Sequence, residues 1–328
     1  MPGPAPIVVT GARGYIGGRL VERLVGSGFA LIGTSRRTTT KPVGWPERAD
    51  LVVLDPAGPP ERMASVLAGA RCVVHLASAN ENRSAEDPDA AVMETGIGAR
   101  HVLEAAILAG VRRFVHVSTI RVYGWPLLGC LSETTRARPI HPYAISHRLS
   151  EDFVLAAHSL GRIEGVVVRL SNVIGAPAWL NIDRWTLLGN ELAQQAVRDG
   201  RLLVRTPNEW REFISLPDVA AGLHALVEAP REVLGDGLFN LGGGCFLRAI
   251  DIAEHMADSA EALFGRRPDI DLGEALEPAG APPFEFPLDR IAQTGFAPSG
   301  ASKLTAELGT FLQMLSSAQA SPVGRGGR

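Results

Sequence analysis

A glycine-rich segment near the start of the chain constrains the fold more than any other stretch. Gly11, Gly14 and Gly17 follow the β-branched run 7–9 and open a helically periodic segment over residues 15–24. A strand, a glycine turn and a helix N-terminus in this order are the context of a dinucleotide-binding fingerprint. Gly11 permits the tight turn, Gly14 lets the backbone approach a pyrophosphate, and Gly17 lets the helix pack closely on its strand. The segment therefore predicts a nucleotide site rather than an ordinary strand-to-helix turn.

Short apolar runs alternate with helical stretches through the first half of the chain. This alternation predicts an α/β fold with a Rossmann-type, doubly wound parallel sheet. Beyond about residue 176 the simple alternation breaks. The elements expected after the glycine segment are strands at 29–34, 51–54, 73–77 and 113–119, helices at 90–110 and 142–158, a helix at 181–199, strands at 202–204 and 212–215, and a helix at 216–229.

Composition limits the class of protein and its partners. The 328 residues are 46% hydrophobic and 20% charged, which is typical of a soluble globular chain. A net charge of -3 gives no sign of binding to nucleic acid or to an anionic membrane. No basic region precedes the first apolar run, and no apolar run reaches the roughly 18 residues that a transmembrane helix needs. The three cysteines fit neither a disulfide framework nor a zinc site, so we expect reduced thiols, no metal and a cytoplasmic location.

The end of the second expected strand bears on the choice of cofactor. In a βαβ unit a carboxylate at this position favours NAD, whereas a nearby arginine accommodates the 2′-phosphate of NADP. Ser35, Arg36 and Arg37 offer one hydroxyl and two guanidiniums, and Arg13 in the glycine turn can approach the same phosphate. The sequence therefore favours NADP, with NAD as the alternative if this is only a solvated basic loop.

The ends of the next two strands also face the expected cofactor. Asp55, followed by Pro56, comes where an acid can accept a hydrogen bond from the adenine amino group. The fourth strand ends at Leu76 and Ala77, which leave room for the cofactor. His75, just before them, is expected to be a packed or hydrogen-bonded core residue rather than a catalyst.

Several motifs together resemble the extended short-chain dehydrogenase/reductases, and in particular their NAD(P)-dependent nucleotide-sugar epimerase, dehydratase and reductase branch. Pro142 suits the first turn of a helix on which Tyr143 and His147, four residues apart, share one face. The resemblance spans roughly residues 6–300. Its motifs are the glycine segment, Val117-Ser118-Thr119 with Val122-Tyr123-Gly124, Tyr143 with its downstream partner, the stretches 169–175 and 211–219, and Phe239-Asn240-Leu241-Gly242.

The resemblance implies roles for individual residues. Thr119 corresponds to the family's hydroxyl that hydrogen-bonds the reacting oxygen, and Tyr143 to its general acid or base. Asn172 and Arg211 correspond to contacts with the diphosphate of a nucleotide-sugar, and Ser78 should lie near the nicotinamide and the sugar. The expected catalytic residues are Thr119, Tyr143 and His147; the expected cofactor-binding residues are Gly11, Arg13, Gly14, Tyr15, Ile16, Gly17, Ser35, Arg36, Arg37, Asp55, Pro56, Leu76, Ala77, Ser78, Tyr143, His147, Leu170, Asn172 and Val173; the expected substrate-binding residues are Ser78, Thr119, Asn172 and Arg211.

The resemblance also implies a division of the chain. Residues 1–175 are expected to form the NAD(P)-binding Rossmann domain. Residues 176–316 are expected to form mainly the smaller substrate-binding portion, interleaved with the sheet. Residues 317–328, rich in Ser, Ala, Gly and Arg, are expected to be a disordered tail.

The chain departs from the family at several positions, two of which have a consequence for chemistry: the single residue His147 and the adjacent pair Ile120 and Arg121. His147 occupies the position of a lysine that lowers the pKa of the tyrosine and bonds the cofactor ribose. Ile120 and Arg121 occupy the positions of the Asp-Glu pair of sugar 4,6-dehydratases, and neither can do that acid–base work, which argues against a dehydratase. A third departure is Thr95, where many members have asparagine.

The loss of the lysine favours reduction over oxidation. A tyrosine with a pKa near 10 is phenolate in only about one molecule in a thousand at pH 7, and a histidine with a pKa of about 6.5 supplies little charge there. Ketone reduction needs the protonated phenol and suffers less than alcohol oxidation. We therefore expect an NADP-dependent oxidoreductase that reduces a nucleotide-linked 4-keto-6-deoxy sugar. The alternatives are a nucleotide-sugar epimerase and a catalytically silent NADP-binding protein.

The two long helices suggest self-association. Residues 90–110 and 142–158 occupy the places of helices that pair across a dimer in many relatives. Four apolar residues on them can form such a contact or can face the subunit's own sheet: Val102, Ala106, Val154 and Ala157. The expected partners are a nucleotide-sugar and a second copy of the chain, with no nucleic acid and no membrane.

Overall fold

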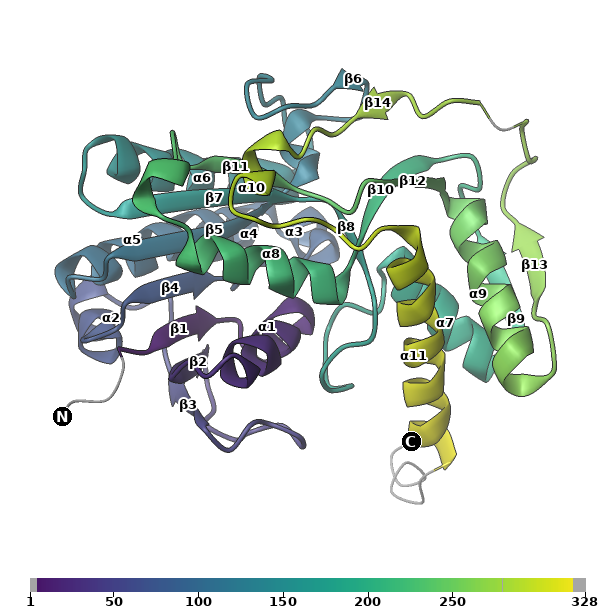
Figure 1. Cartoon of the computed structure of the whole chain (residues 1–328), viewed down its shortest axis with the longest axis horizontal. Helices are drawn as coiled ribbons and strands as arrows, with labels where there is room; N and C mark the ends of the chain where they lie inside the picture. The colour runs from purple at the N-terminus through teal and green to yellow at the C-terminus, as the bar shows by residue number, and fades with distance from the viewer. Residues whose placement is uncertain (1–4, 279, 321–328) are drawn as a thin grey trace.

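The computed structural model describes residues 5–278 and 280–320, and within them the largest sheet has seven parallel strands. Their order is β11–β7–β5–β4–β1–β2–β3 (Figure 1). The Rossmann-type parallel sheet is confirmed. The strands are β1 (Ile7–Thr10), β2 (Leu31–Ser35), β3 (Ala49–Val53), β4 (Cys72–His75), β5 (Arg113–Thr119), β7 (Glu164–Leu170) and β11 (Leu238–Leu241).

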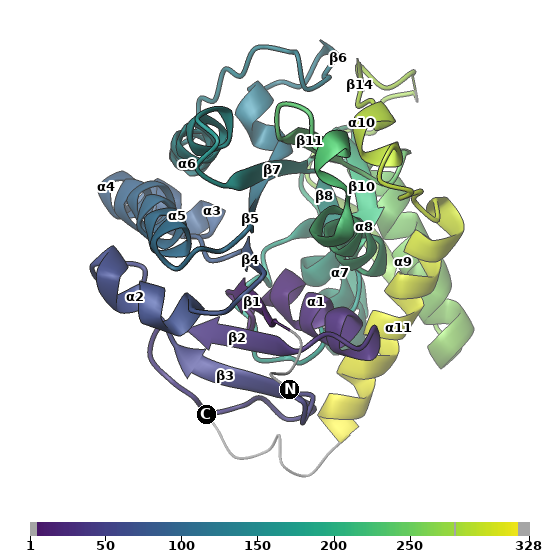
Figure 2. The same cartoon turned by 60° about the vertical axis from the view of Figure 1, so that its left-hand side comes forward.

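Helices cover both faces of this sheet (Figure 2). On one face, α1 (Tyr15–Gly26) and α8 (Leu216–Glu228) pack against the sheet through an apolar core that includes Leu20 and Leu223. On the other face, a second core that includes Val102 joins the sheet to three helices. These are α2 (Pro60–Leu67), α5 (Gly98–Leu108) and α6 (Pro142–Ser159).

The helix expected over residues 90–110 has three parts. It consists of α4 (Pro88–Ala91), a π-helical segment η1 (Val92–Ile97) and α5. The buried Thr95 lies in η1, where its hydroxyl accepts a hydrogen bond from the Ala79 N–H at 3.0 Å. Its carbonyl accepts one from the Ser150 hydroxyl of α6, also at 3.0 Å. Thr95 therefore connects the segment after β4 to α6.

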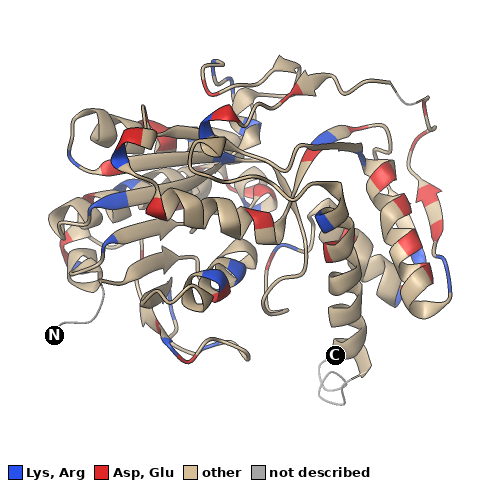
Figure 3. Cartoon of the chain, in the orientation of Figure 1, with Lys and Arg blue, Asp and Glu red and all other residues tan. Residues whose placement is uncertain are grey.

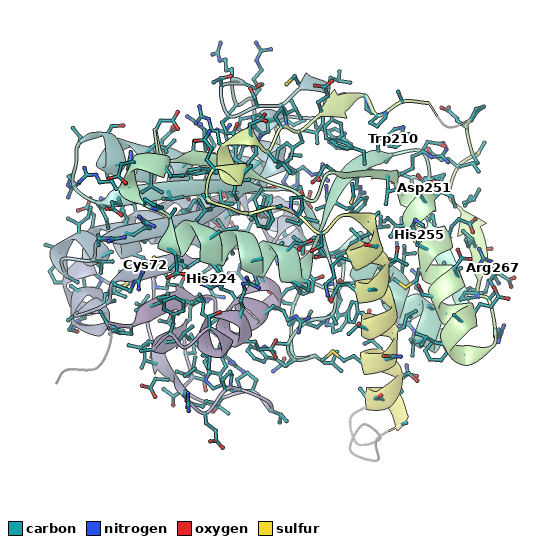
Figure 4. The ribbon with its side chains drawn as sticks, viewed as in Figure 1. Cys72, Trp210, His224, Asp251, His255 and Arg267 are labelled. Atoms are coloured by element: carbon teal, nitrogen blue, oxygen red, sulfur yellow. The ribbon has the colours of Figure 1, made fainter. Side chains whose placement is uncertain are left out.

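A smaller lobe follows β7 and is built around its own apolar core (Figure 1). Figure 4 shows Trp210, Asp251 and His255 in this lobe, with Arg267 just past the end of α9. Its main elements are β8 (Asn172–Ile174), α7 (Leu188–Arg198), β9 (Arg201–Val204), β10 (Trp210–Ser215), β12 (Cys245–Arg248), α9 (Ala249–Phe264), β13 (Asp269–Leu272) and α11 (Ala301–Ala320). Short elements complete the chain: α3 (Glu81–Glu86), η2 (Ile120–Tyr123), β6 (Gly129–Cys130), η3 (Arg231–Val233), β14 (Phe284–Glu285) and α10 (Asp289–Ala292).

Two expectations about the second half of the chain were wrong in part. The helix expected from residue 181 begins only at Leu188, and residues 181–187 form an irregular loop because Trp185 stacks on Phe311 of α11 instead of continuing a helical turn. Residues 317–320, expected in the disordered tail, form the last turn of α11. The rest of that tail lies outside the described residues.

The apolar residues considered for a dimer contact face inward. Val102, Ala106 and Val154 have no exposed surface and Ala157 is 3% exposed, because all four pack in the core between the helices and the sheet. Of the two arrangements expected for them, packing against the subunit's own sheet is therefore confirmed. Within the described ranges, no helix is long and apolar enough to span a membrane.

A buried ion pair fixes α6 to the sheet. Glu151 of α6 and Arg169 of β7 are 0% and 1% exposed at their side chains, and Arg169 Nη2 lies 2.7 Å from Glu151 Oε2. The other carboxylate oxygen accepts a hydrogen bond from the Ser118 hydroxyl of β5 at 2.6 Å. On its far side the Arg169 guanidinium lies over the Tyr123 ring, 4.7 Å from the centroid. Strands β5 and β7 and helix α6 therefore meet at one carboxylate.

We predict that Glu151→Gln lowers the free energy of unfolding by about 3–5 kcal/mol, because it leaves the Arg169 charge buried without a counter-charge. Chemical denaturation measures the change. Glu254→Gln on α9 is the control: it removes the same charge from an exposed ion pair with Arg267 and should barely move the denaturation midpoint. Equal effects of the two substitutions would contradict the prediction.

Candidate active site

The glycine turn between β1 and α1 is built so that the backbone itself can meet a ligand. Gly11 has a φ of 66°, in the left-handed region that favours glycine. A Cβ on Gly17 would lie 2.2 Å from the Gly11 carbonyl oxygen, so only glycine lets α1 pack on the turn. The Gly14 N–H donates to the same carbonyl at 2.9 Å. These constraints explain the glycine spacing, and the helix N-terminus behind the turn fits a dinucleotide pyrophosphate.

A cavity of about 960 Å³ begins at this turn and runs along the carboxyl ends of the strands. Ligands of open α/β sheets bind at this edge. All the residues expected from the sequence to bind or react line this one cavity: Gly11, Arg13, Gly14, Tyr15, Ile16, Gly17, Ser35, Arg36, Arg37, Asp55, Pro56, Leu76, Ala77, Ser78, Thr119, Tyr143, His147, Leu170, Asn172, Val173 and Arg211.

Charged residues that the sequence did not single out line the same cavity. They are Glu81 of α3, Glu94 of η1, and Asp183 and Arg184 of the loop before α7. Local sequence gives no signal for them, because their elements lie far apart along the chain and only the fold brings them to the cavity.

Thr119 and Tyr143 meet at one end of the cavity. Tyr143 lies in the first turn of α6, where the imidazole of His141 caps the helix by accepting a hydrogen bond from the Tyr143 N–H at 3.2 Å. Thr119 ends β5, and its hydroxyl lies close enough to Tyr143 to hydrogen-bond the phenol and lower its pKa. Burial has the larger effect and raises that pKa, while the positive charge of Arg184 lowers it. The phenol is therefore protonated at neutral pH and aimed at the cavity's reacting end.

His147 belongs to a row of three buried histidines. Its ring lies 4.6 Å from the Tyr143 ring and 5.8 Å from that of His116, which in turn lies 5.7 Å from His75. Burial, with a smaller contribution from the positive charge of Arg184, lowers the pKa of His147 to about 3. Burial likewise lowers the pKa of His75 to about 3 and that of His116 well below its usual value.

The inner end of this row is a structural contact, as expected for His75. The Thr10 hydroxyl accepts the Leu76 and Ala77 N–H groups at 3.1 and 3.3 Å and lies 2.8 Å from His75 Nδ1. A hydroxyl that already accepts twice donates its own proton, so His75 accepts at Nδ1 and carries its proton on Nε2.

The adenosine end of the cavity is basic but not free of carboxylate. Arg36 Nη1 lies 3.2 Å from Glu94 Oε2, and Arg83 pairs with the other oxygen of Glu94. Arg37, next along the loop, is exposed. Asp55 uses one carboxylate oxygen to accept the Ala57 N–H at 3.1 Å. A 2′-phosphate would compete with Glu94 for Arg36.

Asn172 and Arg211, which the sequence predicts to contact a nucleotide-sugar, also line the cavity. The Asn172 amide donates to the Glu212 carbonyl at 3.0 Å, which holds its side chain at the end of β8. Arg211 makes a two-point contact with Glu209, at 3.0 and 2.8 Å, so its charge is already compensated. Arg211 can therefore offer directed N–H groups, but little net charge.

Comparison with known proteins identifies the relatives of this chain. Residues 7–242 match the model of the NAD dependent epimerase/dehydratase family. The chain is 30% identical to a dTDP-glucose 4,6-dehydratase of Streptomyces griseus over 79% of its length and 80% of the relative. It is 26% identical to a dTDP-6-deoxy-L-talose 4-dehydrogenase (NAD(P)(+)) of Kitasatospora kifunensis over 78% and 80% of the two chains. The crystal structure of a UDP-glucuronic acid 4-epimerase of Bacillus cereus, in complex with UDP-glucuronic acid and NAD, superposes with a TM-score of 0.78 at 21% identity, covering 94% and 99% of the two chains.

The histidine row predicts a steep loss of stability in mild acid. The three rings stay neutral in the folded state, whereas in the unfolded chain they bind protons below about pH 6.5. The free energy of unfolding should therefore fall as pH decreases from about 6.5 towards 3, by up to about 1.4 kcal/mol per pH unit for each histidine.

Replacing the middle ring tests this. His116→Phe should reduce the pH dependence of the free energy of unfolding between about pH 6.5 and 5 by an amount that corresponds to the uptake of roughly one proton. Chemical denaturation over this range measures it, with His255→Gln on α9 as the matched substitution outside the row (Figure 4). An unchanged slope in His116→Phe would show that the buried rings do not control acid stability.

Proposed function

Because this chain belongs to the NAD-dependent epimerase/dehydratase family, we propose that it is an NADP-dependent oxidoreductase that reduces a carbonyl group of a nucleotide-linked sugar. The family places it among nucleotide-sugar enzymes of the epimerase, dehydratase and dehydrogenase type that use NAD(P), as the resemblance to extended short-chain dehydrogenase/reductases predicted. The finer proposal is a 4-keto-6-deoxy sugar as substrate. The observation that supports carbonyl reduction is the pairing of a protonated Tyr143 with Thr119 at the end of the cavity that begins at the glycine turn.

The residues at this end would perform the proton half of the reaction. A bound nicotinamide cofactor would supply the hydride to the carbonyl carbon. The Thr119 hydroxyl would hold the carbonyl oxygen, and the Tyr143 phenol would donate its proton to that oxygen as negative charge develops. Asn172, Arg211 and Ser78 line the part of the cavity where the nucleotide and sugar would be bound. Gly11, Gly14 and Gly17 would bring backbone N–H groups to the cofactor's phosphates.

Two features favour reduction, the first over alcohol oxidation and the second over dehydration. His147 is neutral, so it does not promote the phenolate that oxidation would need. Ile120 is buried and Arg121 lies over the Trp125 ring, 4.5 Å from its centroid, so neither provides the carboxylic acid that elimination of water requires. The carboxylate close to these two positions is that of Glu81, which lies 3.8 Å from the Arg121 guanidinium. The similarity to a relative named as a sugar 4-dehydrogenase agrees with this proposal.

An assay with NADPH and a dTDP-4-keto-6-deoxy sugar tests the function and its alternatives. A reductase consumes NADPH in proportion to the alcohol formed. An epimerase converts one sugar into its epimer with no net consumption of cofactor. A silent NADP-binding protein binds cofactor and turns over neither.

We propose that NADP(H) is preferred to NAD(H), and predict that it binds at least about tenfold tighter, or about 1.4 kcal/mol. Ser35, Arg36 and Arg37 at the end of β2 support this preference. Arg36→Asp should abolish or reverse it, because it repels the 2′-phosphate. Glu94→Gln should strengthen it, because it releases Arg36 from its ion pair. Titration calorimetry with both cofactors measures these affinities, and equal binding of NADH and NADPH by the wild type would contradict the proposal.

We predict that Tyr143→Phe lowers turnover by a factor on the order of 10² or more with little change in NADPH affinity, as loss of a general acid does. His147→Ala should weaken cofactor binding and lower turnover less. His147→Lys should help alcohol oxidation more than ketone reduction, because it adds a fixed charge beside the phenol. Rates in both directions at matched pH measure these effects. Full activity of Tyr143→Phe would exclude the mechanism.

We also propose that the protein is a cytoplasmic homodimer. Met93 of η1 and Ile145 of α6 are 59% and 44% exposed, and these apolar side chains lie on two elements that pack against each other. In the view of Figure 3, basic and acidic residues are interspersed along the ribbon. Light scattering at micromolar concentration should give twice the mass of the chain, and a monomeric mass would contradict the proposal.

A further inference from the structure

The Tyr143 phenol needs a positive charge near it whenever its oxygen carries negative charge, and His147 cannot supply that charge. The His147 side chain is buried, at 2% exposure, and it packs between the Tyr143 and His116 rings. Neither of its ring nitrogens has a hydrogen-bond partner among the described residues. A protonated imidazole in this position would be an unpaired buried charge, which is strongly unfavourable. The compensating charge must therefore come from another element.

Three of the six arginines that line the cavity are already engaged. Arg36 pairs with Glu94, and Arg211 makes its two-point contact with Glu209. Arg121 lies near Glu81 and over an indole ring. Of the other three, Arg13 lies in the glycine turn and Arg37 just past β2, whereas Arg184 lies in the loop before α7 and lines the cavity together with Tyr143. The Arg184 guanidinium has no carboxylate partner within residues 5–278 and 280–320.

The backbone at Arg184 is held while its side chain stays available. The buried Asn190 donates its amide to the Arg184 carbonyl at 2.8 Å, and the next residue, Trp185, stacks on Phe311 with ring centroids 6.1 Å apart. These two contacts fix the irregular turn before α7 on both sides of the residue. The backbone from which the Arg184 side chain extends is therefore fixed at the edge of the cavity.

The charge of Arg184 already acts on the two rings at the reacting end. It lowers the pKa of Tyr143, and it is the largest of the influences that oppose burial there. It also lowers the pKa of His147, as a cation does for a neighbouring base that would become a like charge. The other groups that act on Tyr143 are Glu81, which opposes Arg184, and Thr119 and Arg121, which act with it.

We propose that Arg184 is the cation that assists Tyr143, supplying from the loop before α7 the positive charge that a basic residue at position 147 would otherwise supply from α6. Arg184 is thus a positioning residue that acts through the phenol and not on the substrate. The proposal rests on the proposed function only in taking Tyr143 as the proton donor. The positive charge of Arg184 lowers the pKa of the Tyr143 phenol. The phenol is then a stronger proton donor for reduction, and a larger fraction of it is phenolate for the reverse oxidation.

The test measures ionisation of Tyr143 directly and requires no turnover. The chain contains three tyrosines, and Tyr143→Phe in each background allows the signal of Tyr143 to be obtained by subtraction. Tyrosinate absorbance is followed upward from about pH 8 and past the ordinary tyrosine pKa of about 10, because burial raises the pKa of Tyr143. Arg184→Gln should move the onset of Tyr143 ionisation upward by about half a pH unit or more, as loss of a nearby cation does. Arg184→Lys, which keeps the charge, should restore the wild-type onset.

One control variant and a nucleotide-binding measurement make the result decisive. Arg198→Gln removes an equal charge from the exposed end of α7, where the side chain is 68% exposed, and should leave Tyr143 ionisation unchanged. An unchanged onset in Arg184→Gln, or no recovery in Arg184→Lys, would overturn the proposal. If Arg184→Gln weakens binding of dTDP or UDP but leaves the ionisation unchanged, then Arg184 is an anchor for the diphosphate and the proposal is wrong. Failure of the reductase assay alone would affect the proposed function and not this inference.

Discussion

The buried ion pair between Glu151 and Arg169 determines where the reactive helix lies. Glu151 is eight residues after Tyr143 on the same helix, about 12 Å along its axis. Because the carboxylate is bound both by Arg169 of β7 and by the Ser118 hydroxyl of β5, α6 cannot slide or rotate without exposing a buried charge. Ser118 directly precedes Thr119. The contact that holds the helix therefore also sets the position of Tyr143 relative to Thr119.

Charge in this interior follows a simple rule: buried guanidiniums have carboxylates, and buried imidazoles stay neutral. Arg113, 1% exposed, pairs with Glu164 and donates to two carbonyls at the end of α8, just as Arg169 pairs with Glu151. The parallel register of β4 and β5 places His75 directly beside His116. Protonating any ring of the row would place a cation beside other buried rings with no counter-charge. His147 thus contributes shape and, through a ring nitrogen, hydrogen-bonding capacity towards a ligand, but no charge.

The fold and most of the cavity were predictable from sequence because their signals are local. The glycine spacing, the strand periodicity and the Tyr143 motif each specify a short segment, and the parallel sheet brings their carboxyl ends to one edge. Arg184 was not predictable, because it lies in a segment whose composition suggested a helix and whose loop form depends on Trp185 meeting Phe311. Periodicity also cannot say which apolar face of a helix meets the sheet. Val102 and Val154 show this, since both proved to face the subunit's own core.

The irregular segment before α7 connects the two ends of the site. Its Trp179 indole donates to the Arg13 carbonyl in the glycine turn at 2.7 Å and lies 5.4 Å from the Trp45 ring. A Cβ on Gly18 would collide with Trp179, so α1 is shaped to accept this segment. A few residues later the same segment presents Arg184 to the cavity. A shift of this segment would therefore act on the cofactor turn and on the proton donor together, while the sheet and α6, held by their buried ion pair, stay in place. In this chain the charge near the phenol thus belongs to the part of the structure that also contacts the cofactor turn, and not to the rigid helix that carries the phenol.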